Sequence, residues 1–157
     1  MDESTNLIAY AGVYADGNDA KSDFDVIKEA HRKSWIGAYD AALFAKTTEG
    51  KVKVLDIDST ERTAGAKAGA LVGAVLGMIF PPSVLVSAGI GAAYGAGVGN
   101  LAKGFGRGDI KDLAEGLLPG ETGILLIANA TFEAGAEKLM KKARKQVKQT
   151  FPAVAAV

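Results

Sequence analysis

The sequence predicts an α+β fold: a ferredoxin-like split βαβ sandwich that carries an inserted glycine-rich helical hairpin. Short apolar runs bounded by turn residues indicate strands, and they alternate with stretches of helical periodicity. One long apolar segment with glycines at helical spacing interrupts this order, and without it the order is β-α-β-β-α-β followed by one more helix. We therefore assign residues 1–59 and 108–157 to the α+β domain and residues 60–107 to the hairpin.

The chain begins with a predicted strand and a predicted helix. Residues 7–14 are a short apolar run that ends at the turn signal Asp16-Gly17-Asn18. The helix that follows is predicted over residues 19–34, with Asn18 or Asp19 as its N-cap.

Two more strands are predicted over residues 39–46 and 51–57, around a turn at Gly50. Alternation in the second strand places three residues on each side, with Val52, Val54 and Asp56 opposite Lys53, Leu55 and Ile57.

The hairpin is predicted as two helices, over residues 60–80 and 83–103, reversed by Pro81-Pro82. Its first helix has three candidate N-caps, Asp58, Ser59 and Thr60.

The second half of the domain begins at Asp109, which is predicted to cap a short helix through Leu117. Residues 122–128 predict a strand, and a final helix capped by Asn129 or Thr131 is predicted to reach Ala143. Residues 146–151 are either the end of that helix or a last strand, and we favour the strand.

Glycines at every fourth position form two ladders in the hairpin. Residues four apart lie on one face of a helix, so each ladder is a stripe without side chains that another backbone can approach closely. A helical glycine costs about 1 kcal/mol relative to alanine in water, so we expect close packing to offset the cost. The residues predicted to mediate helix packing and self-association are Gly65, Gly69, Gly73, Gly77, Gly91, Gly95 and Gly99.

Two environments are open to this hairpin. Each helix is short and diluted by glycine and alanine for a hydrocarbon core about 30 Å thick, but a close-packed pair inserts more readily than either helix alone. Basic residues flank the hairpin, as expected for a cytoplasmic domain, and the candidates for contact with lipid headgroups are Lys67, Lys103 and Arg107. The alternative is a soluble hairpin that packs against copies of itself.

Composition excludes several function classes. The chain has 157 residues, and its 18 basic and 18 acidic residues cancel, so bulk charge gives no reason to expect a nucleic acid partner. Without cysteine there are no disulfides, thiolate metal sites or thiol nucleophiles, and the single histidine excludes paired-histidine metal motifs. The acidic start lacks the features of a secretory signal, so we expect a cytosolic start.

Candidate chemistry is weak, and we expect no catalytic, cofactor or metal site. His31 has acidic residues nearby in the sequence, but a surface role is favoured over a catalytic triad. Residues 97–102 match a loose dinucleotide-binding pattern inside a predicted helix, where the required strand is missing. Asp56 and Asp58 could share one face of a strand, but no third metal ligand is recognisable.

Two further features have structural interpretations. A basic stretch over residues 138–148 is interpreted as a solvated helix face, with contact to anionic lipid as the second interpretation. Trp35 and Tyr39 are interpreted as packing residues of the core or its rim.

Several segments together resemble a family of bacterial proteins. Residues 40–46, residues 50–52, the Gly65 to Gly77 ladder and Leu118-Pro119-Gly120-Glu121 before a strand are similar to DUF1269, a family of predicted membrane proteins of unknown function. The resemblance covers nearly the whole chain and implies a small α+β domain with the same insertion. It implies no catalytic residues.

The expected function is therefore that of a non-enzymatic protein that associates with itself through the glycine ladders. It would be associated with, or inserted in, the inner membrane with its domain on the cytoplasmic face. The alternative is a soluble, cytoplasmic assembly, such as a cage, ring or filament, with the hairpins in its interior. A ligand-binding enzyme or sensor rests on fold analogy alone.

Overall fold

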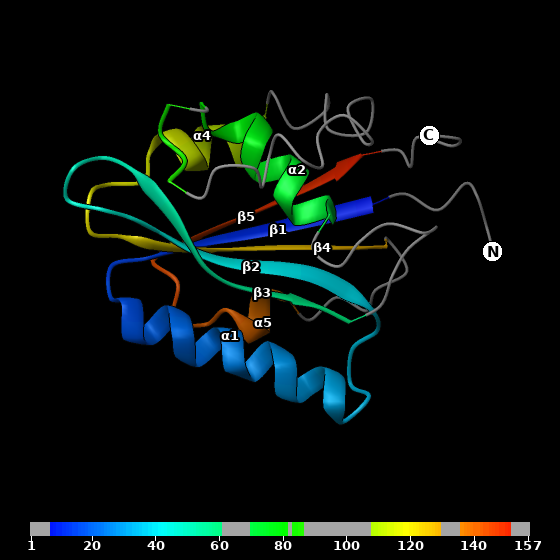
Figure 1. Ribbon diagram of the computed structural model, residues 1–157. Helices are drawn as coiled ribbons and strands as arrows, with labels where there is room; N and C mark the ends of the chain where they lie inside the picture. The colour runs from blue at the N-terminus through cyan, green and yellow to red at the C-terminus, as the bar shows by residue number, and fades with distance from the viewer. Residues whose placement is uncertain (1–6, 61–69, 82, 87–107, 130–135, 152–157) are drawn as a thin grey trace.

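The computed structural model describes residues 7–60, 70–81, 83–86, 108–129 and 136–151. These residues form an α+β fold with one five-stranded antiparallel sheet in the order β3-β2-β4-β1-β5. Helices lie on both faces of the sheet (Figure 1). The elements are β1 (Leu7–Tyr14), α1 (Gly17–Arg32), β2 (Tyr39–Lys46), β3 (Val52–Ser59), α2 (Ala70–Ile79), α4 (Asp109–Glu115), β4 (Thr122–Asn129), α5 (Ala136–Leu139) and β5 (Lys145–Phe151).

The sheet has an interlocked topology. Because neighbouring strands are antiparallel, β1 and β2 run in the same direction with β4 between them. In the same way β4 and β5 run parallel with β1 between them. The third strand, β3, lies at the outer edge beside β2. The strand β4, which follows α2 and α4 in the chain, lies at the centre of the sheet.

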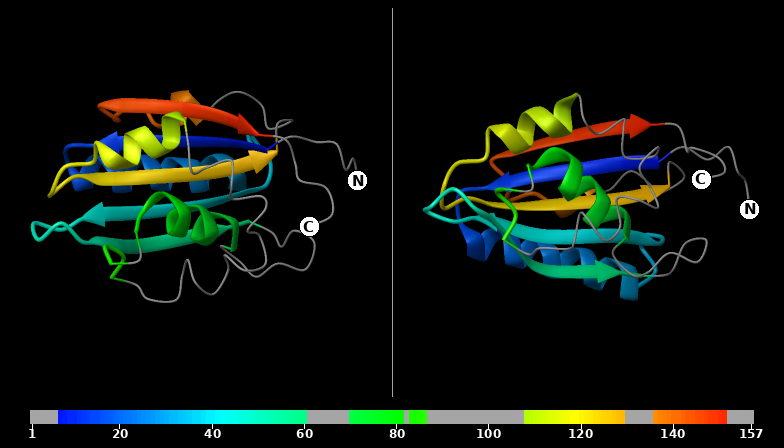
Figure 2. Two further views of the ribbon diagram at one scale, coloured as in Figure 1. Left: turned by 90° about the horizontal axis from the view of Figure 1, so that it is seen from above. Right: turned by 45° about the horizontal axis from the view of Figure 1, so that its top comes forward.

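Each face of the sheet has its own hydrophobic core. Side chains alternate along a strand, so Ala9, Ala11 and Val13 of β1 pack with the side of α2 and α4, whereas Tyr10 and Tyr14 pack with the side of α1 and α5. Figure 2 shows α2 and α4 together on one face. Burial of the central strand β4 on both faces explains its continuous apolar run.

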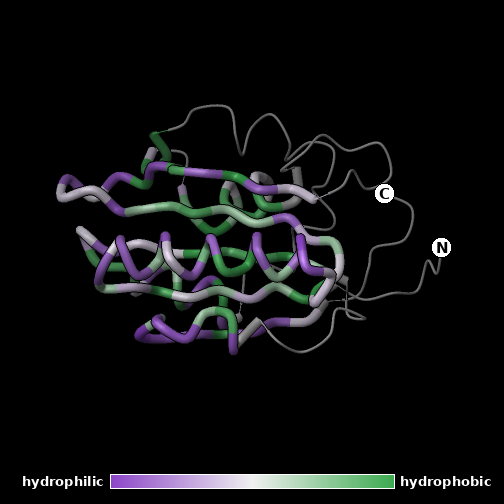
Figure 3. Tube along the Cα trace, turned by 90° about the horizontal axis from the view of Figure 1, so that it is seen from below, coloured by the Kyte–Doolittle hydropathy of each residue, from purple (hydrophilic) through white to green (hydrophobic). Residues whose placement is uncertain are grey.

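The helix α1 is amphipathic, as its sequence pattern predicts. Its residues Ala20, Phe24, Ile27 and Ala30 are buried against the sheet. The alternation of apolar and polar residues along its turns is visible in Figure 3. The predicted N-cap was wrong: Asp16 caps the helix, and its carboxylate accepts a 2.8 Å hydrogen bond from the backbone N–H of Asn18.

The predicted strand over residues 51–57 is confirmed, but its alternation was wrong. A bulge lies opposite the Leu43–Phe44 step, because Leu43 pairs with Asp56 and Phe44 pairs with Val54. As a result Ile57 packs on the same core as Val54. The chain remains in β3 through Ser59, so Asp58 and Ser59 do not cap a helix.

The second half of the chain also departs from its predicted caps. Asp109 is the first residue of α4, and the N-cap is Gly108, which has φ of 96° and offers no side chain. The side chain of Gln149 replaces the cap, since its Oε1 accepts from the backbone N–H of Ile110 at 3.1 Å. The open choice over residues 146–151 is settled in favour of a strand, because β5 pairs with β1.

Candidate functional site

The helix α2 carries the described part of the first glycine ladder. Val72, Val75, Leu76 and Ile79 are buried, and the helix packs on β2 and β4. Gly73 is buried and Gly77 is half-buried, so this part of the stripe lies beside the residues that face the sheet. Met78, the next residue after Gly77, is 40% exposed. The other predicted packing residues and the predicted lipid contacts lie outside the described residues, namely Gly65, Gly69, Gly91, Gly95, Gly99, Lys67, Lys103 and Arg107.

The second predicted hairpin helix does not begin at Ser83. Residues 83–86 form a turn and a single parallel bridge between Leu85 and Val52. The backbone N–H of Val52 donates to the carbonyl of Val84, and that of Val86 donates to the carbonyl of Val52, both at 2.8 Å. The outer edge of β3 has backbone groups that need partners, and this segment supplies them.

The described part of α2 lies against the sheet. Within the part of the chain that the structure describes, no helix combines the length and the apolar character needed to span a bilayer. Val72, Val75, Leu76 and Ile79 of α2 belong to the core on this face of the sheet. At the end of the helix, the amine of Lys111 donates to the carbonyl of Ile79 at 3.0 Å. Moving α2 away would uncover the buried residues Ala42 and Phe44.

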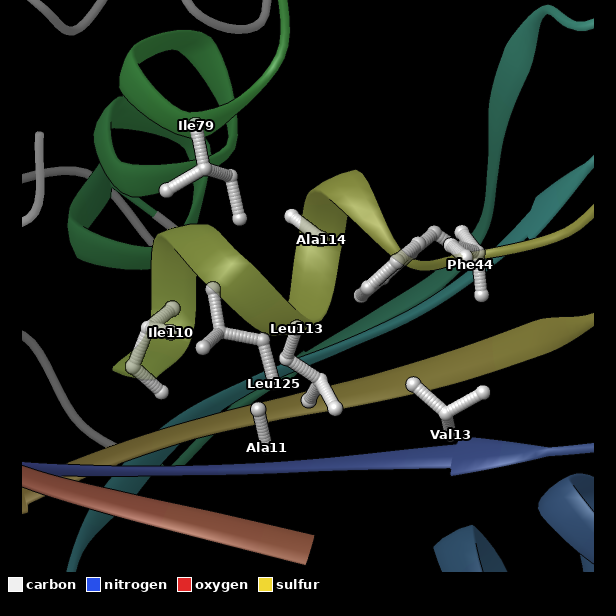
Figure 4. A pocket seen from close by; sticks show the side chains of 9 residues that line it. Ala11, Val13, Phe44, Ile79, Ile110, Leu113, Ala114 and Leu125 are labelled. Carbon is white, nitrogen blue, oxygen red and sulfur yellow. The ribbon is translucent and has the colours of Figure 1, made fainter. Parts of the chain in front are cut away.

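A small cavity lies between α2, α4 and the sheet. Figure 4 shows Ile79 and Ile110 from the helices and Ala11, Val13 and Leu125 from the strands around it. Its volume is about 10 Å³ and its lining is apolar. A single water needs about 10–15 Å³ and polar partners, so this space is a packing gap rather than a ligand site.

Two of the segments that carry the family resemblance meet at one end of the sheet. Lys46, at the end of β2, donates from its backbone N–H to the carbonyl of Glu121 at 2.9 Å and accepts from the N–H of Gly120 at 2.7 Å. Its amine donates to the carbonyl of Leu117 at 3.1 Å. Gly120 has φ of 89°, a conformation that favours glycine.

Glu121 joins this turn to the start of β5. It is 8% exposed and accepts from Nε and Nη2 of Arg144 at 2.5 and 2.7 Å and from the backbone N–H of Leu118 at 2.9 Å. The hydrogen bonds from Arg144 hold the pKa of this carboxyl below its usual value. Glu121 and Arg144 therefore connect the Leu118–Glu121 turn to the turn before β5, and we call this ion pair the clamp.

A second buried carboxylate has a similar structural role. Asp23 is 3% exposed, and its Oδ2 accepts from the hydroxyl of Tyr14 at 3.0 Å and from the backbone N–H of Lys142 at 2.9 Å. Burial, together with Asp23, raises the pKa of Tyr14 well above its usual value. Among the described residues, every buried side-chain nitrogen or oxygen has a hydrogen-bond partner, these two carboxylates included.

His31, Asp56 and Asp58 each contact neighbouring groups of the fold. Nδ1 of His31 lies 3.2 Å from the carbonyl of Gly37, and its ring meets that of Tyr39 edge-on at 5.6 Å. Asp58 accepts from the hydroxyl of Tyr39 at 2.5 Å, and Asp56 pairs with the amine of Lys28 at 3.0 Å. Among the described residues, no three metal-ligating side chains come together.

The basic stretch over residues 138–148 does not form a helix face. The helix α5 ends at Leu139, and the stretch continues as a turn and as β5. Arg144 is engaged by Glu121, while Lys138, Lys141, Lys142 and Lys145 are exposed.

The interpretation of Trp35 as a packing residue was wrong, although that of Tyr39 is confirmed. Trp35 is 67% exposed, whereas Tyr39 is 4% exposed. No apolar periodicity surrounds Trp35 in the sequence, so its position in a loop was the available signal.

Comparison with protein families gives a match to the family described as "Protein of unknown function (DUF1269)", over residues 66–153. The match therefore covers 88 of 157 residues, more than half of the chain. The chain belongs to the DUF1269 family. Comparison with curated proteins and with solved structures gives no match.

The DUF1269 match covers the second half of the fold. It includes α2, α4, β4, α5 and β5, and with them the Leu118–Glu121 turn and its partner Arg144. It begins inside the first glycine ladder and ends in the residues after β5, so β1, α1, β2 and β3 lie outside it.

Proposed function

We propose that this DUF1269 protein is a non-enzymatic, membrane-associated protein that forms homo-oligomers through its glycine stripes. The observation that supports this function is the position of the stripe on α2. The apolar face of the helix is used by the sheet, yet the helix still contains Gly73 and Gly77, four residues apart. Each glycine costs about 1 kcal/mol in a helix relative to alanine, and the partly exposed Gly77 leaves that part of the stripe open to another backbone.

The form of membrane association that agrees best with the docked α2 is peripheral. The domain rests on the cytoplasmic face of a membrane and keeps α2 on its own sheet. A protein with this function needs no cofactor, and its partners are copies of itself and the lipid surface.

In this account the fold is ferredoxin-like in a specific sense. The four strands β2-β4-β1-β5 with α1 and α5 form two interlocked split βαβ units, and both helices pack on one face. The strand β3 and the helices α2 and α4 are additions, with α2 and α4 on the opposite face. In this arrangement α5, rather than the helix predicted over residues 109–117, is the second helix of the motif.

A leucine at Gly77 tests the function. Gly77 is half-buried, so Gly77→Leu blocks close approach of another backbone while leaving the sheet-facing residues unchanged. Met78→Leu, at the exposed neighbouring position, is the matched control. We expect Gly77→Leu, and Gly95→Leu in the second ladder, to reduce the oligomer mass measured by light scattering, with circular dichroism unchanged. Oligomers of the same mass in all variants would contradict the proposal.

The second candidate function is a soluble assembly, and the burial of α2 against the sheet favours it. Fractionation of cells decides between the two. Recovery in the membrane pellet, with release by alkaline carbonate, agrees with peripheral association. Recovery in the soluble fraction under every condition, as a uniform large particle, would establish the alternative.

A further inference from the structure

The loop after α1 displays the one tryptophan of the chain to solvent. Trp35 is 67% exposed, which is unusual for a residue type that is buried on average. Lys33 lies over its ring, with the amine 4.9 Å from the ring centroid.

This exposure is built into an ordered turn. The backbone N–H of Trp35 donates to the carbonyl of Ala30 and that of Ser34 donates to the carbonyl of His31, both at 2.9 Å. This pair of bonds is the Schellman motif, and Ser34 occupies its left-handed position with φ of 62°. The helix end is therefore closed by hydrogen bonds, and Trp35 is the first residue beyond it.

The loop lies at the end of the sheet where the chain enters the glycine-ladder segment. Trp35 is four residues before Tyr39, so their Cα atoms are at most about 14 Å apart. The backbone of Tyr39 exchanges hydrogen bonds with Thr60, from its N–H to Oγ1 of Thr60 at 2.8 Å and to its carbonyl from the N–H of Thr60 at 3.0 Å. Thr60 is the residue from which the chain continues into the first ladder.

Positive charge accompanies the indole at this end. Arg32 and Lys33 are exposed, and Arg32 forms a surface ion pair with Glu29 at 3.2 Å. Such a pair contributes little and is easily exchanged for another anion. An exposed tryptophan beside exposed cations has the chemistry of a membrane–water interface, where the indole lies at headgroup level and lysine or arginine meets anionic lipid.

From these observations we infer that the loop of Arg32, Lys33 and Trp35 is an interfacial anchor that binds the surface of an anionic lipid bilayer. The inference rests on the proposed membrane association and adds the surface through which it occurs. In this orientation the end of the sheet at Thr60 faces the bilayer, and the opposite end at Lys46 faces away from it.

The single tryptophan permits a direct test with the unaltered 157-residue chain. We expect its fluorescence emission to move to shorter wavelength, and its quenching by acrylamide to fall, on addition of vesicles that contain phosphatidylserine. Lipids brominated along the acyl chain should quench it. If the protein sediments with the vesicles while the emission stays unchanged, the inference is wrong and the proposed function stands. If the protein does not sediment with them, the proposed function and the inference both fail.

Variants separate the anchor from general surface effects. Trp35→Ala should lower the vesicle partition coefficient by about tenfold to a hundredfold, given the area an indole buries. Lys33→Gln should lower it about fivefold on anionic vesicles and leave it unchanged on zwitterionic ones. The matched controls at the opposite end are Leu118→Ala, at a residue 58% exposed, and Lys21→Gln in the first turns of α1.

Two outcomes would overturn the inference. One is equal loss of binding in the control variants and in the anchor variants. The other is an emission shift that follows protein concentration without lipid, which would place a second copy of the chain against Trp35.

Discussion

Replacement of Leu76 by alanine tests whether α2 is part of the folded core. Leu76 is fully buried and belongs to the cluster between the helices and the sheet. Truncation of a buried leucine to alanine costs about 2–5 kcal/mol, because the surrounding core relaxes only partly around the missing atoms. We expect the free energy of unfolding to fall by about 3 kcal/mol, and the melting temperature by about 6–12 °C for a chain of this length.

Met78→Ala is the matched control in the same helix. Leucine and methionine have similar helix propensities, so the intrinsic effect of alanine is nearly the same at both positions. Met78 is 40% exposed, and we expect its replacement to change stability by less than about 1 kcal/mol. Urea unfolding in detergent-free buffer, followed by circular dichroism, measures both variants. Equal, small effects at the two positions would refute the docking of α2 on the sheet.

Substitutions at three further positions, Glu121, Ser34 and Gly123, test particular contacts. Glu121→Gln should lower the free energy of unfolding at pH 7 by about 1–3 kcal/mol. Because the folded-state pKa of Glu121 is depressed, its contribution to stability is complete above the unfolded pKa of about 4.3 and is lost as the pH falls through the folded pKa. The wild type should therefore lose more stability on acidification than the variant, and parallel pH profiles would contradict the clamp. Ser34→Gly should raise stability by about 1 kcal/mol because it relieves a positive φ, and Ser34→Val should lower it; identical urea midpoints would argue against the Schellman turn. Gly123→Ala should lower the free energy of unfolding by about 1–3 kcal/mol, because the added Cβ would lie 2.5 and 2.7 Å from ring atoms of Phe44. The control is Gly37→Ala, where an added Cβ meets nothing within 4 Å. Equal melting temperatures of the two variants would show that Phe44 moves freely.

The strands were predictable where local signals agree. Residues 7–14, 39–46 and 122–128 are apolar runs bracketed by turn residues, and each is a strand. Their order in the sheet was not predictable, since pairing joins residues far apart in the sequence. Nothing within residues 51–57 shows that this strand lies at an edge, or that its alternation shifts at a bulge.

The environment of α2 illustrates a different limit. The spacing of Val72, Val75, Leu76 and Ile79 predicts an apolar helix face, and that face exists. An apolar face is equally suited to a bilayer and to a sheet, so periodicity alone cannot choose between them. The structure shows a sheet beneath it.

The exposure of Trp35 has a geometric cause that local sequence patterns do not display. Its exposure depends on a helix end that closes with serine, rather than the usual glycine, in the left-handed position. A sequence search for helix ends gives weight to glycine, and here Gly37 lies two residues beyond the tryptophan.

The mass of the 157-residue chain in detergent-free buffer tests self-association most directly. The monomer mass is 16.1 kDa, and sedimentation equilibrium at micromolar concentration should give a discrete multiple of it. We expect Gly77→Leu to shift that mass toward the monomer and Met78→Leu to leave it unchanged. A wild-type mass of 16.1 kDa at every concentration would contradict the account.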